Sequence, residues 1–187
     1  RKVREALSEL DLAYVNNPCA KGSRNRDTVV HTGGRALFPF LVDPNTGTQM
    51  YESEKIIDYL RETYGPGRRS VVWRMVAPLN TATSAVASAV RPRGRAVTRH
   101  AKMRPPPQRP LVLYNFEASP YCRKVREVLA ELDLHHQVRS VAKNSARRPE
   151  LIEKGGKMMV PYLRDPNTQT ALYESDDIVN YLRSTYG

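Results

Sequence analysis

The chain repeats itself once, at an offset of 122 residues and without a gap. Residues 1–12, RKVREALSELDL, align with residues 123–134, RKVREVLAELDL. Residues 33–65 align in the same way with residues 155–187, and about half of the 65 paired positions are identical. Because the offset far exceeds the roughly 20–50 residues of solenoid repeats, the pattern predicts two globular copies of one domain.

Charge divides the chain into three parts. The 187 residues carry a formal net charge of +11, but residues 1–65 hold nine basic and nine acidic side chains. Residues 111–187 hold eleven basic and ten acidic side chains. Residues 66–110 hold ten basic side chains, no acidic one and seven of the fourteen prolines. We therefore predict a first domain at 1–65, a basic proline-rich linker at 66–110 and a second domain at 111–187.

The basic linker allows two interpretations. It is a flexible spacer, or its fairly apolar stretch from Val71 to Val90 forms a short helix on an anionic membrane surface or a larger complex, followed by basic residues. Nucleic acid fits less well as a partner, because few aromatic side chains interleave the basic residues to stack on bases. No charge-free apolar run of about 18 residues predicts a membrane span.

The second copy has the fuller pattern of elements. Its composition and periodicity predict the order βαβαββα, with a hairpin at the turn sequence DPNT and a last helix capped by Ser175. Tyrosines recur at matched positions of both copies, which predicts shared core packing. The predicted elements are strand 111–116, helix 123–132, strand 136–141, helix 149–154, hairpin strands 158–163 and 171–173, and a final helix from 175.

A motif whose side chains could take part in a reaction lies between the first strand and the first helix of the second copy. It reads Ser119-Pro120-Tyr121-Cys122, and Arg123 and Lys124 follow it. A helix N-terminus favours a thiolate, so this position predicts a lowered pKa for Cys122 and a reactive thiol. The alternative is that Cys122 is an inert core thiol. The second cysteine of the chain, Cys19, fits a small buried hydrophobic residue.

These features resemble the thioredoxin fold in the form found in glutaredoxins and in glutathione transferase N-terminal domains. The resemblance covers residues 111–187 wholly and residues 1–65 in part. It implies an α/β fold of two thioredoxin-like βαβαββα domains, the first without its N-terminal strand, because Arg1 aligns with Arg123. The tandem layout with a basic linker resembles a plant and green-algal protein family, which implies a chloroplast location. We expect Arg1 not to be the native start, or a strand of another chain to complete the first copy.

The resemblance also implies a glutathione site. The SPYC motif is similar to the CPYC motif of glutaredoxins, but Ser119 stands where that family has its exposed nucleophilic cysteine. Ser119 and Cys122 are therefore the implied catalytic residues: either Ser119 hydrogen-bonds a glutathione thiolate, or Cys122 forms a mixed disulfide with glutathione. The implied glutathione ligands of the second copy are Tyr121, the cis-proline pair Val160-Pro161 and the anion-binding pair Glu174-Ser175. In the first copy they are Phe38, Pro39, Glu52 and Ser53.

Two functions remain open from the sequence. The first is a glutathione-binding thiol-redox protein, acting, if it is an enzyme, as a glutathione-dependent thiol-disulfide oxidoreductase or transferase. The second is a non-catalytic accessory or scaffold subunit that docks on an organellar membrane or large complex through its basic linker. No metal is expected, because His31, His100, His135 and His136 show no ligand spacing with the cysteines and fit surface or partly buried positions.

Overall fold

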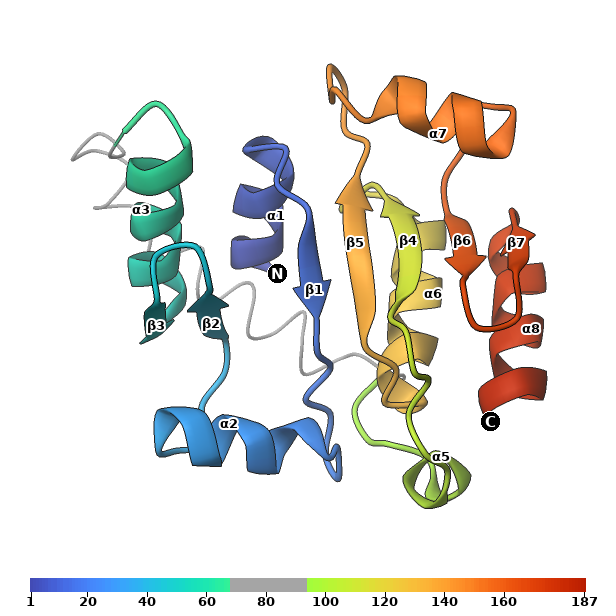
Figure 1. Ribbon diagram of the computed structural model, residues 1–187, viewed down its shortest axis with the longest axis horizontal. Coiled ribbons are helices and arrows are strands. Elements are labelled where there is room, and N and C mark those ends of the chain that lie inside the picture. The colour runs from blue at the N-terminus through green and yellow to red at the C-terminus, as the bar shows by residue number, and fades with distance from the viewer. Residues whose placement is uncertain (68–93) are drawn as a thin grey trace. The chain divides into compact units, whose positions relative to one another are not determined.

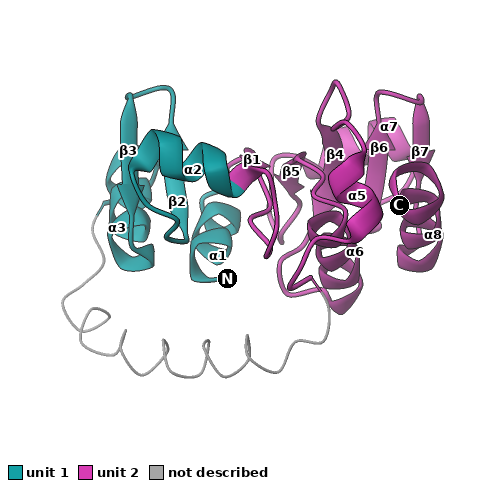
Figure 2. Ribbon diagram, turned by 90° about the horizontal axis from the view of Figure 1, so that it is seen from below, with its two compact units in different colours: residues 1–10, 26–92 teal, residues 11–25, 93–187 magenta. Residues whose placement is uncertain are grey.

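The computed structural model describes residues 1–67 and 94–187, which fall into two compact units (Figure 2). Of the described residues, unit 1 comprises 1–10 and 26–67, and unit 2 comprises 11–25 and 94–187. The stretch Val71 to Val90, predicted as a possible surface helix, lies outside the described residues. The unit boundaries differ from the predicted domains, because a short segment of the first copy belongs to unit 2.

Unit 2 is built on a five-stranded sheet in the order β1-β5-β4-β6-β7 (Figure 1). Strand β4 runs parallel to β5 on one side and antiparallel to β6 on the other. This β5-β4-β6-β7 arrangement, with helices on both faces, is the predicted thioredoxin-like α/β fold. The elements of the second copy are β4 (Leu111–Asn115), α6 (Pro120–Glu131), β5 (His136–Ser140), α7 (Arg148–Gly155), β6 (Tyr162–Asp165), β7 (Thr170–Leu172) and α8 (Ser175–Tyr186).

Alternation along β4 produces two cores, one on each face of the sheet. Leu111 and Leu113 are fully buried on the face covered by α6 and α8, with the apolar residues of those helices. Tyr114 faces the other side and packs with Leu151 of α7 and with Tyr162. Because both faces are covered, β4 reads as the continuous apolar run LVLY rather than as a polar-apolar alternation.

Unit 1 holds the remaining elements of the first copy. Helices α1 (Lys2–Glu9) and α3 (Ser53–Tyr64) pack together through buried Ala6, Leu7, Ile56, Ile57 and Leu60. Strands β2 (Phe40–Asp43) and β3 (Thr48–Tyr51) form a two-stranded sheet, and α2 (Asn25–Gly33) precedes them. The strand that corresponds to β5, which is β1 (Tyr14–Asn16), does not join β2 and β3; it pairs antiparallel with β5 in unit 2.

The end of the predicted linker is part of unit 2. Val97 and Ala101 are buried in the same core as Leu111 and the α6 side chains. Thr98 is the N-cap of a short helix, α5 (Arg99–Met103), and its side chain accepts a hydrogen bond from the backbone N–H of Ala101. Two small apolar residues anchor a segment whose basic and proline-rich composition predicted a spacer. None of the described helices is long and apolar enough to cross a membrane.

A buried carboxylate closes the β6–β7 hairpin. Asp165 is 1% exposed and accepts hydrogen bonds from the hydroxyls of Tyr181 (2.7 Å) and Tyr186 (2.5 Å). Its own turn contributes the N–H of Asn167 at 2.8 Å. Unit 1 repeats the arrangement, with Asp43 accepting from Tyr59 and Tyr64 at 2.6 Å each. These tyrosines recur because they hydrogen-bond the aspartate of the DPNT turn, which is more specific than the predicted core packing.

Burial disfavours ionisation of Asp165, but the hydrogen bonds from Tyr186, Tyr181 and Asn167 outweigh it and lower the pKa. The ionised carboxylate is therefore the form that stabilises the folded state. This contribution is present above the unfolded-state pKa of about 3.9 and is lost as the pH falls through the lower folded-state pKa. The same holds for Asp43, whose pKa is lowered by Tyr59 and Tyr64.

We expect Asp165→Asn to reduce the free energy of unfolding by about 3 kcal/mol at pH 7, because two buried phenol donors lose a charged acceptor. Urea unfolding followed by circular dichroism measures this loss. The difference from the wild type should shrink below about pH 4, where the native carboxylate becomes protonated. Asp177→Asn, at an exposed position of α8, is the matched control and should change stability little. An equal loss in both variants would contradict the role of Asp165.

Candidate functional site

The SPYC motif lies where β4 ends and α6 begins. Ser119 is the N-cap of α6, and its hydroxyl oxygen accepts a hydrogen bond from the backbone N–H of Cys122 at 3.3 Å. Pro120 occupies the first helical turn, where a missing N–H costs nothing. Tyr121 is 63% exposed, whereas Cys122 is fully buried. The motif therefore presents a serine hydroxyl and a tyrosine at its surface and turns its thiol into the core.

The buried position changes the expected chemistry of Cys122. Burial raises the pKa of its thiol, and the hydrogen bonds from Phe116 and Ser119 together with the charge of Arg126 oppose this only in part. The sequence predicted the reverse direction from the helix N-terminus. The difference arises because Cys122 is in the third position of α6 and faces the core, where desolvation of a thiolate exceeds the helix-terminus effect. The thiol is protonated at neutral pH.

Two residues that sequence reasoning missed hold the motif loop. Arg126 of α6 contacts Asn115 at the end of β4 and forms an ion pair with Glu117 at 3.3 Å. Both side chains are nearly buried, at 11% and 8% exposure. The pair therefore fixes the loop that carries Ser119 to the helix that follows it. A signal was available, because Arg126 aligns with Arg4 in the identical run RKVRE of the first copy.

Strand register brings the cis-proline pair beside the motif loop. Tyr114 of β4 lies opposite Tyr162 of β6, so Val160 and Pro161, just before Tyr162, lie next to the residues that follow Tyr114. The Val160-Pro161 bond is cis, as the sequence predicted, and so is Phe38-Pro39. Val160 is half-buried and Pro161 is buried. The backbone of residue 160 is thus placed at the same end of the sheet as Ser119.

The N-terminus of α8 reaches this same end. Leu163 pairs with Leu172, so two further steps along the hairpin set Glu174 opposite Pro161. Lys124 of α6 also contacts Asp176 in the first turn of α8, which ties the two helix N-termini together. Ser175 is the first residue of α8 rather than the predicted cap, and it is buried at 5% exposure. Its hydroxyl lies among the first N–H groups of the helix, which favour an anion.

Glu174 adopts a backbone conformation that few residues tolerate. Its φ is +62° and its ψ 125°, and the matched Glu52 of unit 1 has a φ of +70°. Such conformations suit glycine and cost other residues about 1–3 kcal/mol. The side chain of Glu174 is exposed, so no core packing accounts for glutamate at this position. Retained strain at the entrance of a helix is typical of a ligand-binding position.

Unit 1 presents a partial version of the same site. Phe38 is 39% exposed, and the guanidinium of Arg26 lies 5.0 Å from the centre of its ring. Continuing the register of Phe40 with Tyr51 sets Pro39 opposite Glu52, as in unit 2. Ser53 begins α3, and no equivalent of Ser119 occurs in residues 1–65. Of the predicted residues, unit 1 therefore assembles the cis-proline pair and the helix N-terminus.

One hollow in the described residues lies away from the candidate site. A hollow of about 350 Å³ is found at the opposite end of α8, lined by Pro106, Pro107, Gln108, Arg109, Asn167 and Tyr186. It contains none of the predicted site residues. Within residues 1–67 and 94–187, no cluster of three or more His, Cys, Asp and Glu side chains is arranged to hold a metal ion.

Comparison with known proteins finds a matching family and similar proteins. The family described as glutathione S-transferase, N-terminal domain, matches residues 1–68 and 113–187. The glutathione S-transferase-like protein tpcF of Aspergillus fumigatus is 36% identical over 81 residues, which are 43% of this chain and 36% of the relative. A crystal structure of a glutathione transferase from Phanerochaete chrysosporium matches 42% of this chain and 38% of its own, with 23% identity and a TM-score of 0.35.

The fold defines a thioredoxin-like α/β domain in which the N-termini of α6 and α8 lie at the same end of the sheet. The family match covers well over half of the residues, so the chain belongs to the glutathione S-transferase N-terminal domain family. The chain spans about a third of the length of the curated relative that it matches.

We expect the two cysteines to differ in reactivity in the folded protein. Iodoacetamide at pH 7.5 should modify Cys19, which is half-buried, and leave Cys122 unmodified, because its thiol is enclosed and protonated. Peptide mapping by mass spectrometry locates the adduct. Cys19→Ser should then acquire no adduct until urea unfolds it, and prompt native labelling of Cys122 would contradict the buried assignment.

Proposed function

We propose that unit 2 binds glutathione at the end of the sheet where Ser119, the Val160-Pro161 pair and Ser175 meet. The convergence of these three elements carries the proposal. They come from three separate parts of the chain, and in the β4–β6–β7 register they lie at one end of the sheet. Membership of the glutathione S-transferase N-terminal domain family supports the same ligand.

Each element fits one part of glutathione. The buried hydroxyl of Ser175 and the first N–H groups of α8 suit the γ-glutamyl carboxylate. The extended backbone at Val160 suits the cysteinyl peptide group, because a backbone segment can exchange hydrogen bonds with another. Exposed Tyr121 adds an aromatic surface next to Ser119. The acidic side chains of Asp176 and Asp177 weaken the anion site, and the contact of Lys124 with Asp176 offsets part of their charge.

The geometry favours Ser119, not Cys122, as the residue that meets the glutathione sulfur. The Ser119 hydroxyl is only half-buried and sits at the N-terminus of α6, where its O–H is able to donate to a thiolate. A glutathione thiolate held there attacks the glutathione sulfur of a mixed disulfide. A bond forms between the two glutathione sulfurs, the old disulfide bond breaks, and the released thiolate takes a proton from water. Cys122 remains a buried structural thiol throughout.

We expect reduced glutathione to bind the full chain in isothermal titration calorimetry. Ser175→Ala should weaken binding about tenfold, because the γ-glutamyl carboxylate of glutathione then loses a hydrogen bond worth roughly 1.4 kcal/mol. Ser119→Ala should weaken binding and remove any release of glutathione from a glutathionylated peptide. Cys122→Ala should bind normally.

Ser184→Ala is the matched control, because Ser184 lies on the same helix as Ser175 but bonds only the carbonyl of Tyr181 among the described contacts. It should leave affinity unchanged. No heat of binding with the wild-type chain, or activity lost in Cys122→Ala but kept in Ser119→Ala, would overturn the assignment of the site.

A second function is supported by the described end of the basic segment. Residues 94–110 contain Arg95, Arg99, Lys102, Arg104 and Arg109 with no acidic residue, and Met103 is 79% exposed on α5. A cationic segment with an exposed apolar side chain suits a membrane surface rich in anionic lipid. The chloroplast location inferred from the resemblance stays a prediction.

We expect the chain to co-sediment with phosphatidylserine-containing vesicles and to dissociate as ionic strength rises. The double variant Arg99→Glu with Lys102→Glu should bind more than tenfold less, since each basic residue near such a surface contributes about 1 kcal/mol. The control reverses two exposed charges elsewhere, Lys143→Glu with Lys154→Glu. Equal losses in both double variants would indicate that overall charge, and not α5, governs binding.

A further inference from the structure

The pairing of β1 with β5 has local twofold symmetry. Tyr14 lies opposite Val138, and Asn16 lies opposite His136. The offset of 122 residues makes Tyr14 equivalent to His136 and Asn16 equivalent to Val138. Exchanging the two copies therefore turns each of these pairs into the other. Val15 opposite Gln137 is transformed into itself, so the twofold axis passes between these two residues.

The contacts that flank the strands obey the same symmetry. The carboxylate of Asp11 accepts hydrogen bonds from the hydroxyl of Ser145 at 2.6 Å and from the backbone N–H of Ala146 at 3.1 Å. It also pairs with the guanidinium of Arg147 at 2.9 Å. On the other side, the equivalent Asp133 accepts from the backbone N–H of Arg24 at 3.0 Å. Arg24 is the residue equivalent to Ala146.

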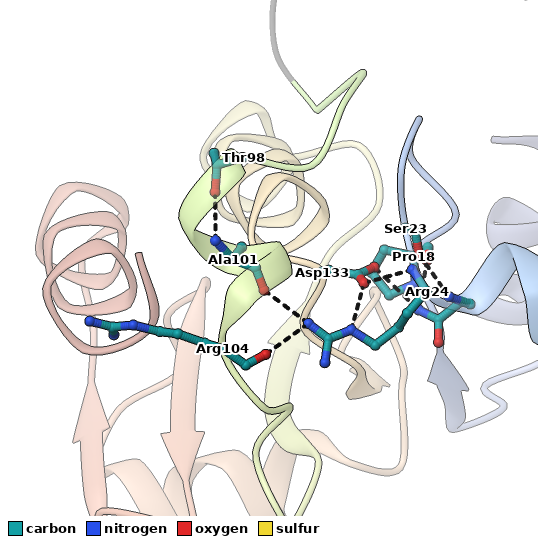
Figure 3. Close-up of polar contacts among 8 residues, drawn as sticks. Pro18, Ser23, Arg24, Thr98, Ala101, Arg104 and Asp133 are labelled. Atoms are coloured by element: carbon teal, nitrogen blue, oxygen red, sulfur yellow. Dashed lines mark hydrogen bonds and ion pairs between the residues drawn. The ribbon is translucent and has the colours of Figure 1, made fainter.

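Figure 3 shows the contacts of Asp133 beside the β1–β5 pairing. Arg24 donates from its Nε to Asp133 at 3.0 Å and from its terminal nitrogen to the carbonyls of Ala101 and Arg104. The side chain of Asp133 is only 2% exposed, so this pair is well shielded from water. Asp11 and Asp133 also share a left-handed backbone, with φ of 51° and 54°. The contacts around Asp11 and those around Asp133 are thus alike in backbone conformation as well as in partners.

Symmetry of this kind makes the β5 edge complementary to itself. The second copy contains both halves of the contact, the acceptor at Asp133 and the donors at 145–147. Two β5 edges placed in the same register would set Gln137 opposite Gln137 and each Asp133 against the Ser145, Ala146 and Arg147 of the other chain. Every group that now binds Asp11 would have an equivalent acceptor. An interface in which one patch binds its own copy is the usual basis of a twofold dimer.

We propose that the edge formed by Asp133, β5 and residues 145–147 binds the same edge of a second copy of this chain whenever β1 leaves it. Strand β1 is then an internal substitute for that second copy. An uncovered strand edge is a template for pairing with another chain, and charge complementarity between Asp133 and Arg147 selects this register. The proposal is independent of glutathione binding, because none of its residues belongs to the proposed ligand site.

The test opens the edge in the full chain. Asp11→Arg with Val15→Pro should release β1, since it removes the acceptor for residues 145–147 and prevents regular pairing of a three-residue strand. Val15 is 53% exposed, so no buried side chain is lost. Light scattering during size-exclusion chromatography should then give twice the monomer mass at tens of micromolar. Adding Asp133→Arg should weaken this dimer at least tenfold, because Arg147 then faces a like charge.

A cross-link tests the register without relying on the proline variant. In a Cys19→Ser background, Asp11→Ala with Gln137→Cys should form an interchain disulfide under mild oxidation, because paired residues of antiparallel strands have the required separation. The matched control carries His135→Cys in place of Gln137→Cys; residue 135 would lie opposite residue 139, so it should cross-link much less. A folded open variant that stays monomeric at about 100 μM, or equal cross-linking at 135 and 137, would overturn the proposal.

Discussion

Strand β4 is paired on both edges, and most of unit 2 follows from that constraint. Its parallel pairing with β5 and antiparallel pairing with β6 leave it no freedom to shift, because a slip of one residue would exchange the faces of Leu113 and Tyr114. The end of β4 is therefore fixed in space. This register sets the position of the motif loop that follows β4. It also sets the position of the Val160-Pro161 segment beside that loop.

The fixed loop explains why serine and cysteine in one motif have different environments. Cys122 lies three positions after Ser119, which is nearly one helical turn. Ser119 is the cap and stays at the boundary with solvent, while Cys122 enters the core between β4 and α6. The Arg126–Glu117 ion pair joins this loop to α6. The Ser119 hydroxyl is thus accessible for hydrogen bonding, whereas the Cys122 thiol is enclosed.

Local patterns were enough to predict most of unit 2. The apolar run at 111–116, the amphipathic helix of α6 and the DPNT hairpin are set by neighbours in sequence, and they appear within a few residues of their predicted bounds. The cis-proline pair of the candidate site was expected from the family resemblance and not from local pattern. The direction of the Cys122 pKa shift was wrong, because desolvation depends on which helix face meets the core rather than on position in the motif.

Long-range pairing was beyond the sequence pattern. A short strand such as β1 offers the same backbone groups to any edge, and side-chain contacts such as those of Asp11 and Arg24 favour its pairing with β5. His136, predicted at or near the surface, is fully buried beneath this pairing and bonds the carbonyl of Leu134 through Nδ1. Val97 and Ala101 were assigned to a linker because two small apolar side chains barely alter the composition of a basic, proline-rich stretch.

The discontinuous course of unit 2 has a consequence for how the chain folds. Strand β1 and its partner β5 are more than a hundred residues apart in sequence, and residues 26–67 of unit 1 lie between them. Such non-local contacts form late, since a long loop must close before they are gained. During synthesis β1 emerges long before β5 exists. Strand β1 therefore has no β5 to pair with until residues 136–140 have been made.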